Sequence, residues 1–246
     1  MAKIFITGSS DGLGLMAAQL LQGEGHQVVL HARNAQRGDD ALSQVPGAEK
    51  VLTADLAHPE ETKELAAKVN ALGSFDAVIH NAGVNQAPNE VILAVNTLAP
   101  YILTCLIQQP KRLIYMSSNL HVHGDPALKR MTQGKGGASY ADSKLHDIIL
   151  CMAVARLWTG VYANAVDPGW VPTKMGGPDA PDKLENGFKT QAWLAVSNDP
   201  KAQVSGRYFF HQKEKHHRPE ANDVDTQEKF LALCEQLSGV RFPDNG

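Results

Sequence analysis

The sequence predicts an α/β fold, a doubly wound parallel sheet of about seven strands with helices on both faces. Short apolar runs alternate with longer helical patterns along the whole chain, and a glycine-rich turn follows the first run. The 246 residues, 43% of them hydrophobic, suffice for one large core. We therefore expect a single domain over residues 1–246.

The predicted strands are short, and helical patterns separate them. The strands are expected at residues 3–7, 28–31, 51–54, 77–80, 112–116, 162–166 and 207–210. The helices are expected at residues 13–22, 39–44, 59–72, 184–196 and 227–237, within 136–158, and between the fourth and fifth strands. Strands joined through helices favour right-handed crossovers, and hence parallel pairing.

Composition and charge argue against nucleic acid and membranes as partners and against disulfide bonds. A formal charge of -3 and a pI near 6.4 give no reason to expect nucleic acid or an anionic membrane surface. We expect no leader peptide, because Lys3 leads straight into a predicted strand, and no membrane span, because no apolar run approaches the roughly 18 residues that cross a bilayer. Cys105, Cys151 and Cys234 are odd in number and far apart, which favours free thiols and a cytoplasmic location.

The turn after the first predicted strand has the composition of a phosphate cradle. Glycines there permit a tight turn and a close backbone approach to a pyrophosphate, and the helix N-terminus offers free N–H groups to the anion. An incidental turn is the weaker alternative, because this one lies between a strand and a helix. The expected cofactor-binding residues are Thr7, Gly8, Ser10, Asp11, Gly12, Leu13 and Gly14.

The end of the second strand should meet the adenosine ribose of a dinucleotide. It reads His31-Ala32-Arg33-Asn34, with no acidic residue before Asp39. An aspartate there would bind the ribose hydroxyls and repel a 2′-phosphate, whereas Arg33 would attract one. We expect NADP(H) rather than NAD(H), unless Arg33 is merely a solvated loop residue. Asp55 and Leu56, after the third strand, are expected at the adenine edge.

Tyr140 and Lys144 are expected to share one face of a helix, one turn apart. An ammonium beside a phenol favours the phenolate and lowers the pKa of the tyrosine toward neutrality. Such a tyrosine can exchange a proton with a carbonyl oxygen. The alternative is that the pair only decorates a surface helix.

Six motifs in order make the chain resemble the classical short-chain dehydrogenase/reductase family, whose fold is Rossmann-type. Besides the cradle and the Tyr-x-x-x-Lys pair, they are Asn81-Ala82-Gly83, Asn96, Ser117-Ser118, and Pro168-Gly169 with Thr173. Ser143-Lys144-Leu145, and a histidine soon after the serines, are similar to the retinol-dehydrogenase-like and ketoreductase branch. The resemblance runs from Thr7 to about Phe210.

The resemblance implies a role for each matched residue. Tyr140 would exchange the proton, Lys144 would hold the nicotinamide ribose, and Ser118 would hydrogen-bond the substrate oxygen. Asn96 would hold a water that links Lys144 to solvent, unless it only caps a helix kink. Asn81, Ala82, Gly83, Pro168, Gly169, Val171 and Thr173 would complete the cofactor site, together with Tyr140 and Lys144.

Two spacings depart from the family pattern. The interval from Ser118 to Tyr140 is longer than usual, which leaves open whether Ser117 or Ser118 is catalytic. We expect residues 121–137 and 176–196 to form substrate loops. Asn81 and Asn96 lie closer together than usual, in a neighbourhood that often forms a dimer face. We therefore expect a monomer or homodimer rather than a tetramer.

The sequence thus favours an NADPH-dependent reductase of a small ketone or aldehyde, or the reverse alcohol oxidation. The alternative is a non-catalytic NAD(P)-sensing regulator, and such proteins often lose the tyrosine or the lysine. His211, His216 and His217 lie in a charged segment, so no metal site is expected. The identity of the substrate, the stereochemistry and the physiological direction are not predicted.

Overall fold

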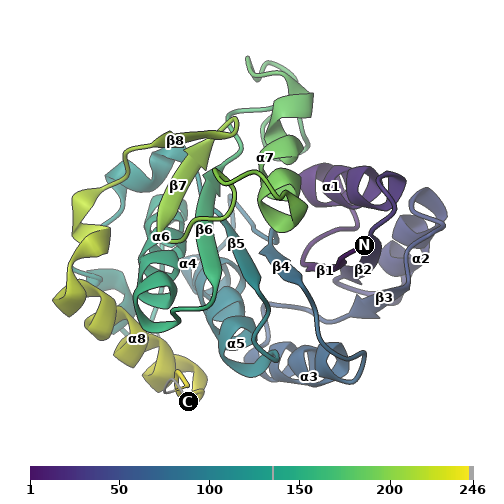
Figure 1. The fold of residues 1–246 in the computed structure, drawn as a ribbon. Helices are drawn as coiled ribbons and strands as arrows, with labels where there is room; N and C mark the ends of the chain where they lie inside the picture. Colours follow the sequence, from purple (N-terminus) through teal and green to yellow (C-terminus); the bar gives the residue numbers. More distant parts are fainter. Residues whose placement is uncertain (135, 244–246) are drawn as a thin grey trace.

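The computed structural model describes residues 1–134 and 136–243, which form one mixed sheet between two helical layers (Figure 1). The strand order is β3-β2-β1-β4-β5-β6-β7-β8. Pairing is parallel from β3 through β7, and β8 is antiparallel to β7. The strands are β1 (Lys3–Ile6), β2 (Gln27–Ala32), β3 (Lys50–Thr53), β4 (Ala77–His80), β5 (Arg112–Met116), β6 (Tyr162–Asp167), β7 (Arg207–Phe210) and β8 (Lys213–Lys215).

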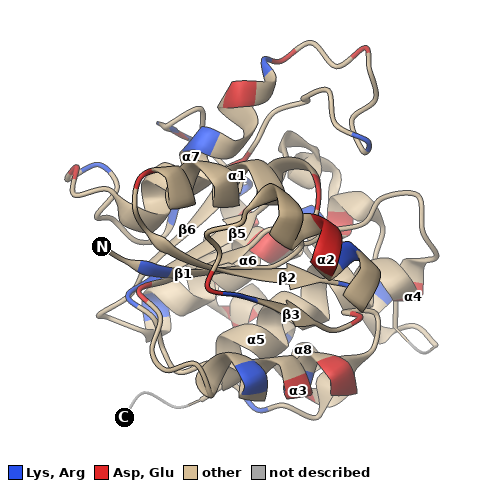
Figure 2. Cartoon of the chain, turned by 90° about the vertical axis from the view of Figure 1, so that its right-hand side faces the viewer, with Lys and Arg blue, Asp and Glu red and all other residues tan. Residues whose placement is uncertain are grey.

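Helices cover both faces of the sheet, as Figure 2 shows. One face packs against α1 (Gly12–Gly23), α2 (Ala35–Gln44) and α7 (Leu184–Val196). The other packs against α3 (Pro59–Asn70), α4 (Asn89–Ile92), the π-helical turn η1 (Leu93–Leu98), α5 (Ala99–Leu106), α6 (Tyr140–Leu157) and α8 (Val224–Ser238). The 3₁₀ turns are η2 (Asn119–His123), η3 (Lys129–Thr132) and η4 (Pro219–Asn222).

The central strands are apolar on both sides because both of their faces are covered. All four residues of β4 are buried, as are Ile4, Phe5 and Ile6 of β1. Ile4 lies opposite Val28 in β2 and opposite Ala77 in β4. The chain therefore extends the sheet from β1 in both directions, which creates a topological switch point between β1 and β4. Ligands of such sheets bind at the carboxyl ends of the strands beside this point.

The Rossmann-type fold predicted from the sequence is confirmed, with one strand more than the expected seven. The additional strand, β8, consists of three exposed residues, and it lies in the charged segment for which no strand was expected. It carries no apolar alternation, so its pairing with β7 comes from the turn at His211 and Gln212. Both turn residues have positive φ values, 49° and 60°, as a tight two-residue hairpin requires.

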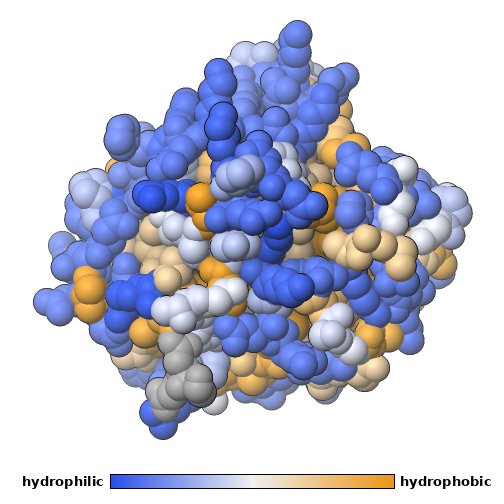
Figure 3. Space-filling view, viewed as in Figure 1, coloured by the Kyte–Doolittle hydropathy of each residue, from blue (hydrophilic) through white to orange (hydrophobic). Residues whose placement is uncertain are grey.

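The expectation that no apolar stretch is long enough to span a bilayer was wrong for one helical stretch. The helical stretch Asn89–Leu106 is long and apolar enough to span a membrane, with a mean hydropathy of 1.3. However, 67% of it is buried inside the fold, as is usual for a core helix. Hydrophilic residues cover most of the face shown in Figure 3, with smaller apolar patches between them.

Candidate active site

A cavity of about 620 Å³ opens at the carboxyl ends of the strands, beside the switch point. Its size suits a small organic ligand or cofactor. The predicted residues in its wall are Gly8, Ser10, Asp11, Gly12, Leu13, Arg33, Asp55, Leu56, Asn81, Ala82, Gly83, Tyr140, Lys144, Pro168 and Thr173. The wall also contains His31, Arg37, Ala54, Ala57, Val84, Val91, Val95, Met116, Ser117, Lys174 and Met175.

The turn between β1 and α1 is held in shape by the segment after β4. The Asn81 amide donates to the carbonyl oxygens of Thr7 and Gly8, at 3.0 and 3.2 Å. The Thr7 hydroxyl accepts from the backbone N–H groups of Asn81 and Ala82, both at 3.0 Å. Gly8 has a φ of +63°, and a Cβ there would lie 2.8 Å from the Ala82 Cα. The turn therefore requires glycine at this position.

His31 completes this framework, a role that was not predicted. Its Nδ1 accepts from the Gly8 N–H at 3.0 Å, so its protonated Nε2 donates to the Ala54 carbonyl at 3.1 Å. The ring thus joins β2 to the cradle and to the end of β3. Burial lowers the pKa of His31 to about 4, so the ring stays neutral at pH 7.

Basic side chains gather around the N-terminus of α1. Asp11 caps this helix by accepting from the Gly12 N–H at 2.8 Å. Lys174 and Arg37 both contact the Asp11 carboxylate, at 2.5 and 3.3 Å. The hydrogen bond from Lys174 is the main reason why the pKa of Asp11 is lowered. Arg33 also lines the cavity and makes no ion pair within the described part of the chain.

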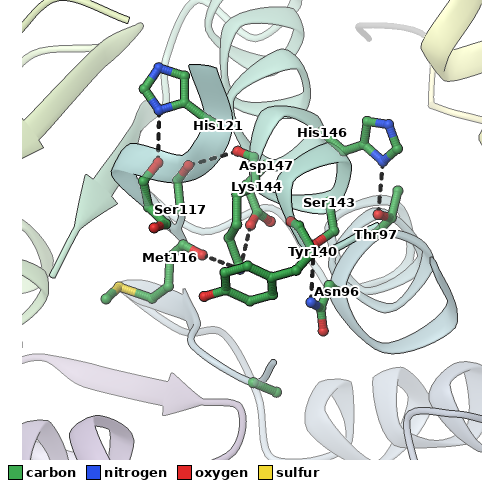
Figure 4. A network of polar contacts seen from close by, with 12 residues as sticks. Asn96, Thr97, Met116, Ser117, His121, Tyr140, Ser143, Lys144, His146 and Asp147 are labelled. Atoms are coloured by element: carbon green, nitrogen blue, oxygen red, sulfur yellow. Dashed lines mark hydrogen bonds and ion pairs between the residues drawn. The ribbon is translucent and has the colours of Figure 1, made fainter. Parts of the chain in front are cut away.

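Tyr140 and Lys144 lie on the first two turns of α6, at the cavity wall. The helix begins there because Ser139 and Asp142 form a reciprocal capping box. Lys144 Nζ lies 5.6 Å from the centre of the Tyr140 ring and donates to the Met116 carbonyl at 2.6 Å (Figure 4). The predicted pairing of the two side chains on one helical face is therefore present.

The two serines after β5 lie in different environments. The buried Ser117 donates its hydroxyl to the Lys144 carbonyl at 2.7 Å. Ser118 is half-buried, and its Oγ accepts from the Leu120 N–H at 3.2 Å. Ser118 is absent from the cavity wall, whereas Ser117 is part of it. The Ser118 hydroxyl also donates to the Asn119 side-chain oxygen at 3.3 Å, so both hydroxyls have partners. The choice of Ser118 as the catalytic serine therefore stays a prediction.

Asn96 lies in the π-helical turn η1 and is almost fully buried. Its amide accepts from the Val84 N–H at 2.8 Å and donates to the Val84 carbonyl and the Ser143 hydroxyl, at 2.9 and 3.0 Å. These bonds tie the segment after β4 to α6. This geometry supports a structural role, and a water relay through Asn96 stays a prediction.

The remaining predicted residues surround the cavity without all reaching it. Thr7, Gly14, Gly169 and Val171 lie behind the wall, and the Thr173 N–H donates to the Val171 carbonyl at 2.8 Å. Residues 121–137 contribute nothing to the described wall, and Leu128 and Met131 within this segment are buried in the core. The role of the segments 121–137 and 176–196 as substrate loops stays a prediction.

His121, in the 3₁₀ turn after β5, makes hydrogen bonds at both of its ring nitrogens. His121 donates from Nδ1 to the Ser118 carbonyl at 2.7 Å, and its Nε2 accepts from the Arg218 N–H at 3.3 Å. No group of three or more metal-binding side chains occurs within residues 1–134 and 136–243.

Taken together, the site offers an anion cradle, a phenol and a buried ammonium. This combination suits proton transfer beside a bound dinucleotide.

Comparison with known proteins agrees with this arrangement. A model described as short chain dehydrogenase matches residues 2–109. An uncharacterized oxidoreductase of Emericella nidulans is 46% identical over 256 aligned positions, covering 99% of both chains. Human retinol dehydrogenase 13 is 27% identical, over 98% of this chain and 85% of the human protein. A solved blue fluorescent protein from a metagenomic library, in complex with NADPH, has a TM-score of 0.71 at 22% identity, covering 85% of this chain and 95% of that one.

Proposed function

The chain belongs to the short-chain dehydrogenase/reductase family, in the branch that includes the retinol dehydrogenases, and on this premise we propose that it is an NADPH-dependent carbonyl reductase. It would reduce a ketone or aldehyde to an alcohol, or catalyse the reverse reaction. The observation that supports this most strongly is that Tyr140 and Lys144 adjoin each other in the wall of the cavity that also contains the phosphate cradle.

In this proposal, residues of the chain handle the proton and the developing charge. The Tyr140 hydroxyl donates a proton to the carbonyl oxygen during reduction and accepts it during oxidation. The Lys144 ammonium stabilises the phenolate electrostatically, and Ser118 hydrogen-bonds the substrate oxygen. The nicotinamide cofactor, when bound, supplies or accepts the hydride.

Several features support a dinucleotide in the cradle. Gly8 lines the cavity without a side chain, which leaves the backbone of the turn open to a ligand, and the N-terminus of α1 lines the cavity at Gly12 and Leu13. Arg33, which has no ion-pair partner among the residues that the structure describes, favours a 2′-phosphate and therefore NADP(H) over NAD(H). A structural neighbour bound to NADPH shares the fold.

The substrate end of the cavity is apolar. Val84, Val91, Val95, Met116 and Met175 line it, and the Met175 sulfur lies 4.0 Å from the Tyr140 hydroxyl. We propose a fairly apolar small-molecule substrate, because polar groups would lose hydration there without gaining partners. A cytoplasmic monomer or homodimer stays part of the proposal.

Replacing Tyr140 by Phe tests the proposal. A panel of ketones, aldehydes and alcohols, followed by NADPH absorbance, first identifies a convertible substrate. Tyr140→Phe should then lower kcat by about 100-fold or more, because the proton donor is lost. NADPH affinity, measured by fluorescence titration, should change little. A kcat close to that of the parent in this variant would contradict the assignment, and NADPH binding without turnover of any panel member would favour a regulator.

A further inference from the structure

Lys144 forms a buried ion pair with Asp147, a residue that the family motifs do not include. Lys144 Nζ donates to Asp147 Oδ2 at 2.8 Å, across nearly one turn of α6 (Figure 4). Lys144 and Asp147 are only 5% and 3% exposed. A carboxylate so deep in the fold is rare unless it is paired. Asp147 meets this condition through Lys144, and because Lys144 lines the cavity, the ion pair can have a role there.

The geometry limits where the ammonium can point. An ammonium has three N–H donors. Two of them are engaged, by the Met116 carbonyl at 2.6 Å and by Asp147 at 2.8 Å. Lys144 also lines the cavity beside Tyr140, so the third donor remains for that side. The hydrogen bonds to Met116 and Asp147 together hold Lys144 Nζ in one position.

Asp147 also stabilises the positive charge of Lys144. A lone ammonium in a buried site tends to lose its proton, because desolvation disfavours the charged form. Asp147 is the carboxylate that contacts Nζ within the described residues. We propose that Asp147 is a positioning residue, a buried counter-ion that keeps the Lys144 ammonium charged and directed at the cavity. This inference rests on the proposed function only for its catalytic consequence.

The titratable groups around the pair are consistent with this role. Burial acts to lower the pKa of Lys144, but attraction to Asp147 and Tyr140 outweighs it, so this pKa is raised. Burial raises the pKa of Asp147 to about 6, against the opposing effect of Lys144. Tyr115 of β5 and Cys151 of α6 also face Asp147, and burial is the main reason why the pKa values of both are raised. Both therefore stay neutral near pH 7, which leaves Lys144 as the cation opposite Asp147.

A titration of the lysine itself tests the inference without any substrate. The full-length protein is labelled with ¹³C at the ε-carbon of lysine, and the Lys144 signal is assigned by its loss in Lys144→Met. In the parent protein this signal should keep its ammonium shift up to about pH 10. Asp147→Asn and Asp147→Ser remove the charge with different shapes. Each should lower the titration midpoint of Lys144 by more than about one pH unit.

Two further variants serve as controls. Asp225→Asn makes the same substitution at an exposed residue of α8 and should leave the Lys144 midpoint at its parent value. Asp147→Glu retains the carboxylate and should keep the midpoint near that of the parent. An unchanged midpoint in both uncharged variants would overturn the inference, and so would a fall in the Glu variant as large as in the Asn variant.

The pH dependence of turnover then separates this inference from the proposed function. In Asp147→Asn, kcat should decline as the pH rises through the lowered midpoint of Lys144, while the parent stays active. A Tyr140→Phe variant that remains active would refute the reductase assignment but not the ion-pair role. An inactive Tyr140→Phe variant, combined with an unshifted profile in Asp147→Asn, would refute the ion-pair role alone.

Discussion

Arg33 follows the carboxyl end of β2, directly after Ala32, and lines the cavity. Its situation differs from that of the two other cations at the cradle. Arg37 and Lys174 both contact the Asp11 carboxylate, and Arg37 also donates to the Ser10 hydroxyl at 3.3 Å. Arg33 has no such partner within the described residues. A 2′-phosphate would therefore meet a free guanidinium at Arg33 and partly neutralised cations beside it.

Arg33→Ala should weaken NADPH binding by roughly tenfold, the effect of losing one charge-assisted hydrogen bond. NADH binding should change little, because NADH lacks the phosphate. Calorimetric titration with both cofactors measures the two effects. Arg207→Ala, at an exposed arginine of β7, controls for the loss of a positive charge. Equal losses for NADPH and NADH in Arg33→Ala would show that Arg33 does not read the 2′-phosphate.

The sequence was informative for site residues whose role depends on local spacing. Tyr140 and Lys144 lie one helical turn apart, so any α-helix brings them together. His31 and Lys174 could not be found in this way. The partners of His31 are Gly8 and Ala54, and that of Lys174 is Asp11, all of which lie far away in the sequence. Asp147 pairs with Lys144 three residues away, but the sequence alone does not show that this pair is buried. Such contacts depend on how the elements pack, which a single sequence does not reveal.

At the scale of elements, α6 organises the segment that precedes it. Asp142 in its first turn is 3% exposed and accepts from the backbone N–H groups of Asp125 and Ser139, both at 2.9 Å. It also pairs with Arg130 at 2.8 Å. Burial tends to raise the pKa of Asp142, but these bonds outweigh it and lower the pKa. One carboxylate thus caps the helix of Tyr140 and anchors residues 125–130.

Asp142→Asn should destabilise the protein by about 1–3 kcal/mol, because an amide has one acceptor oxygen and no charge. Urea unfolding measures this change in the free energy of unfolding. Limited proteolysis should also cut residues 125–137 faster, since their anchor is weakened. Asp225→Asn, in the first turn of α8, removes a comparable charge near a helix N-terminus, and Asp225 has no such partners within residues 1–134 and 136–243. If both variants lose the same stability, the anchoring role is refuted.

The hydrophobic pattern predicted an element well where all of its residues are buried, as in β4. All four residues of β4 are buried, and its bounds matched the expected residues 77–80. The signal failed for β8, which is exposed and charged, and for η1, whose π-helical turn leaves no mark in an apolar pattern. An exposed short strand depends on its neighbour, and a π-turn depends on a local insertion in the hydrogen-bond ladder.

Over the whole molecule, three buried histidines lie in the packed interior, one each in β2, β4 and α6. Burial is the main cause of the lowered pKa in each, which is about 4 for His31, 3 for His80 and 4 for His146. His146 pairs with the Thr97 hydroxyl at 3.0 Å, and His80 stacks on Tyr115 with ring centres 4.9 Å apart. All three must be neutral in the folded state.

The sign of the resulting pH effect follows from proton binding. In the unfolded chain these histidines titrate near pH 6.5. Below that pH the unfolded state binds more protons than the folded state, so stability falls as the pH is lowered toward 4. Each histidine should cost about 1–2 kcal/mol between pH 6.5 and 5. Asp147 acts in the opposite direction, because its pKa is raised to about 6, and offsets part of this loss.

We therefore expect the free energy of unfolding to be roughly 2–5 kcal/mol lower at pH 5 than at pH 7.5. Urea unfolding at the two pH values measures the difference. His80→Phe keeps an aromatic ring against Tyr115 and removes one titrating group, so the difference should shrink by about 1–2 kcal/mol. His216→Phe makes the same change at an exposed histidine of the charged segment after β8. If it shrinks the difference equally, or if His80→Phe leaves it unchanged, burial of the histidines does not cause the acid sensitivity.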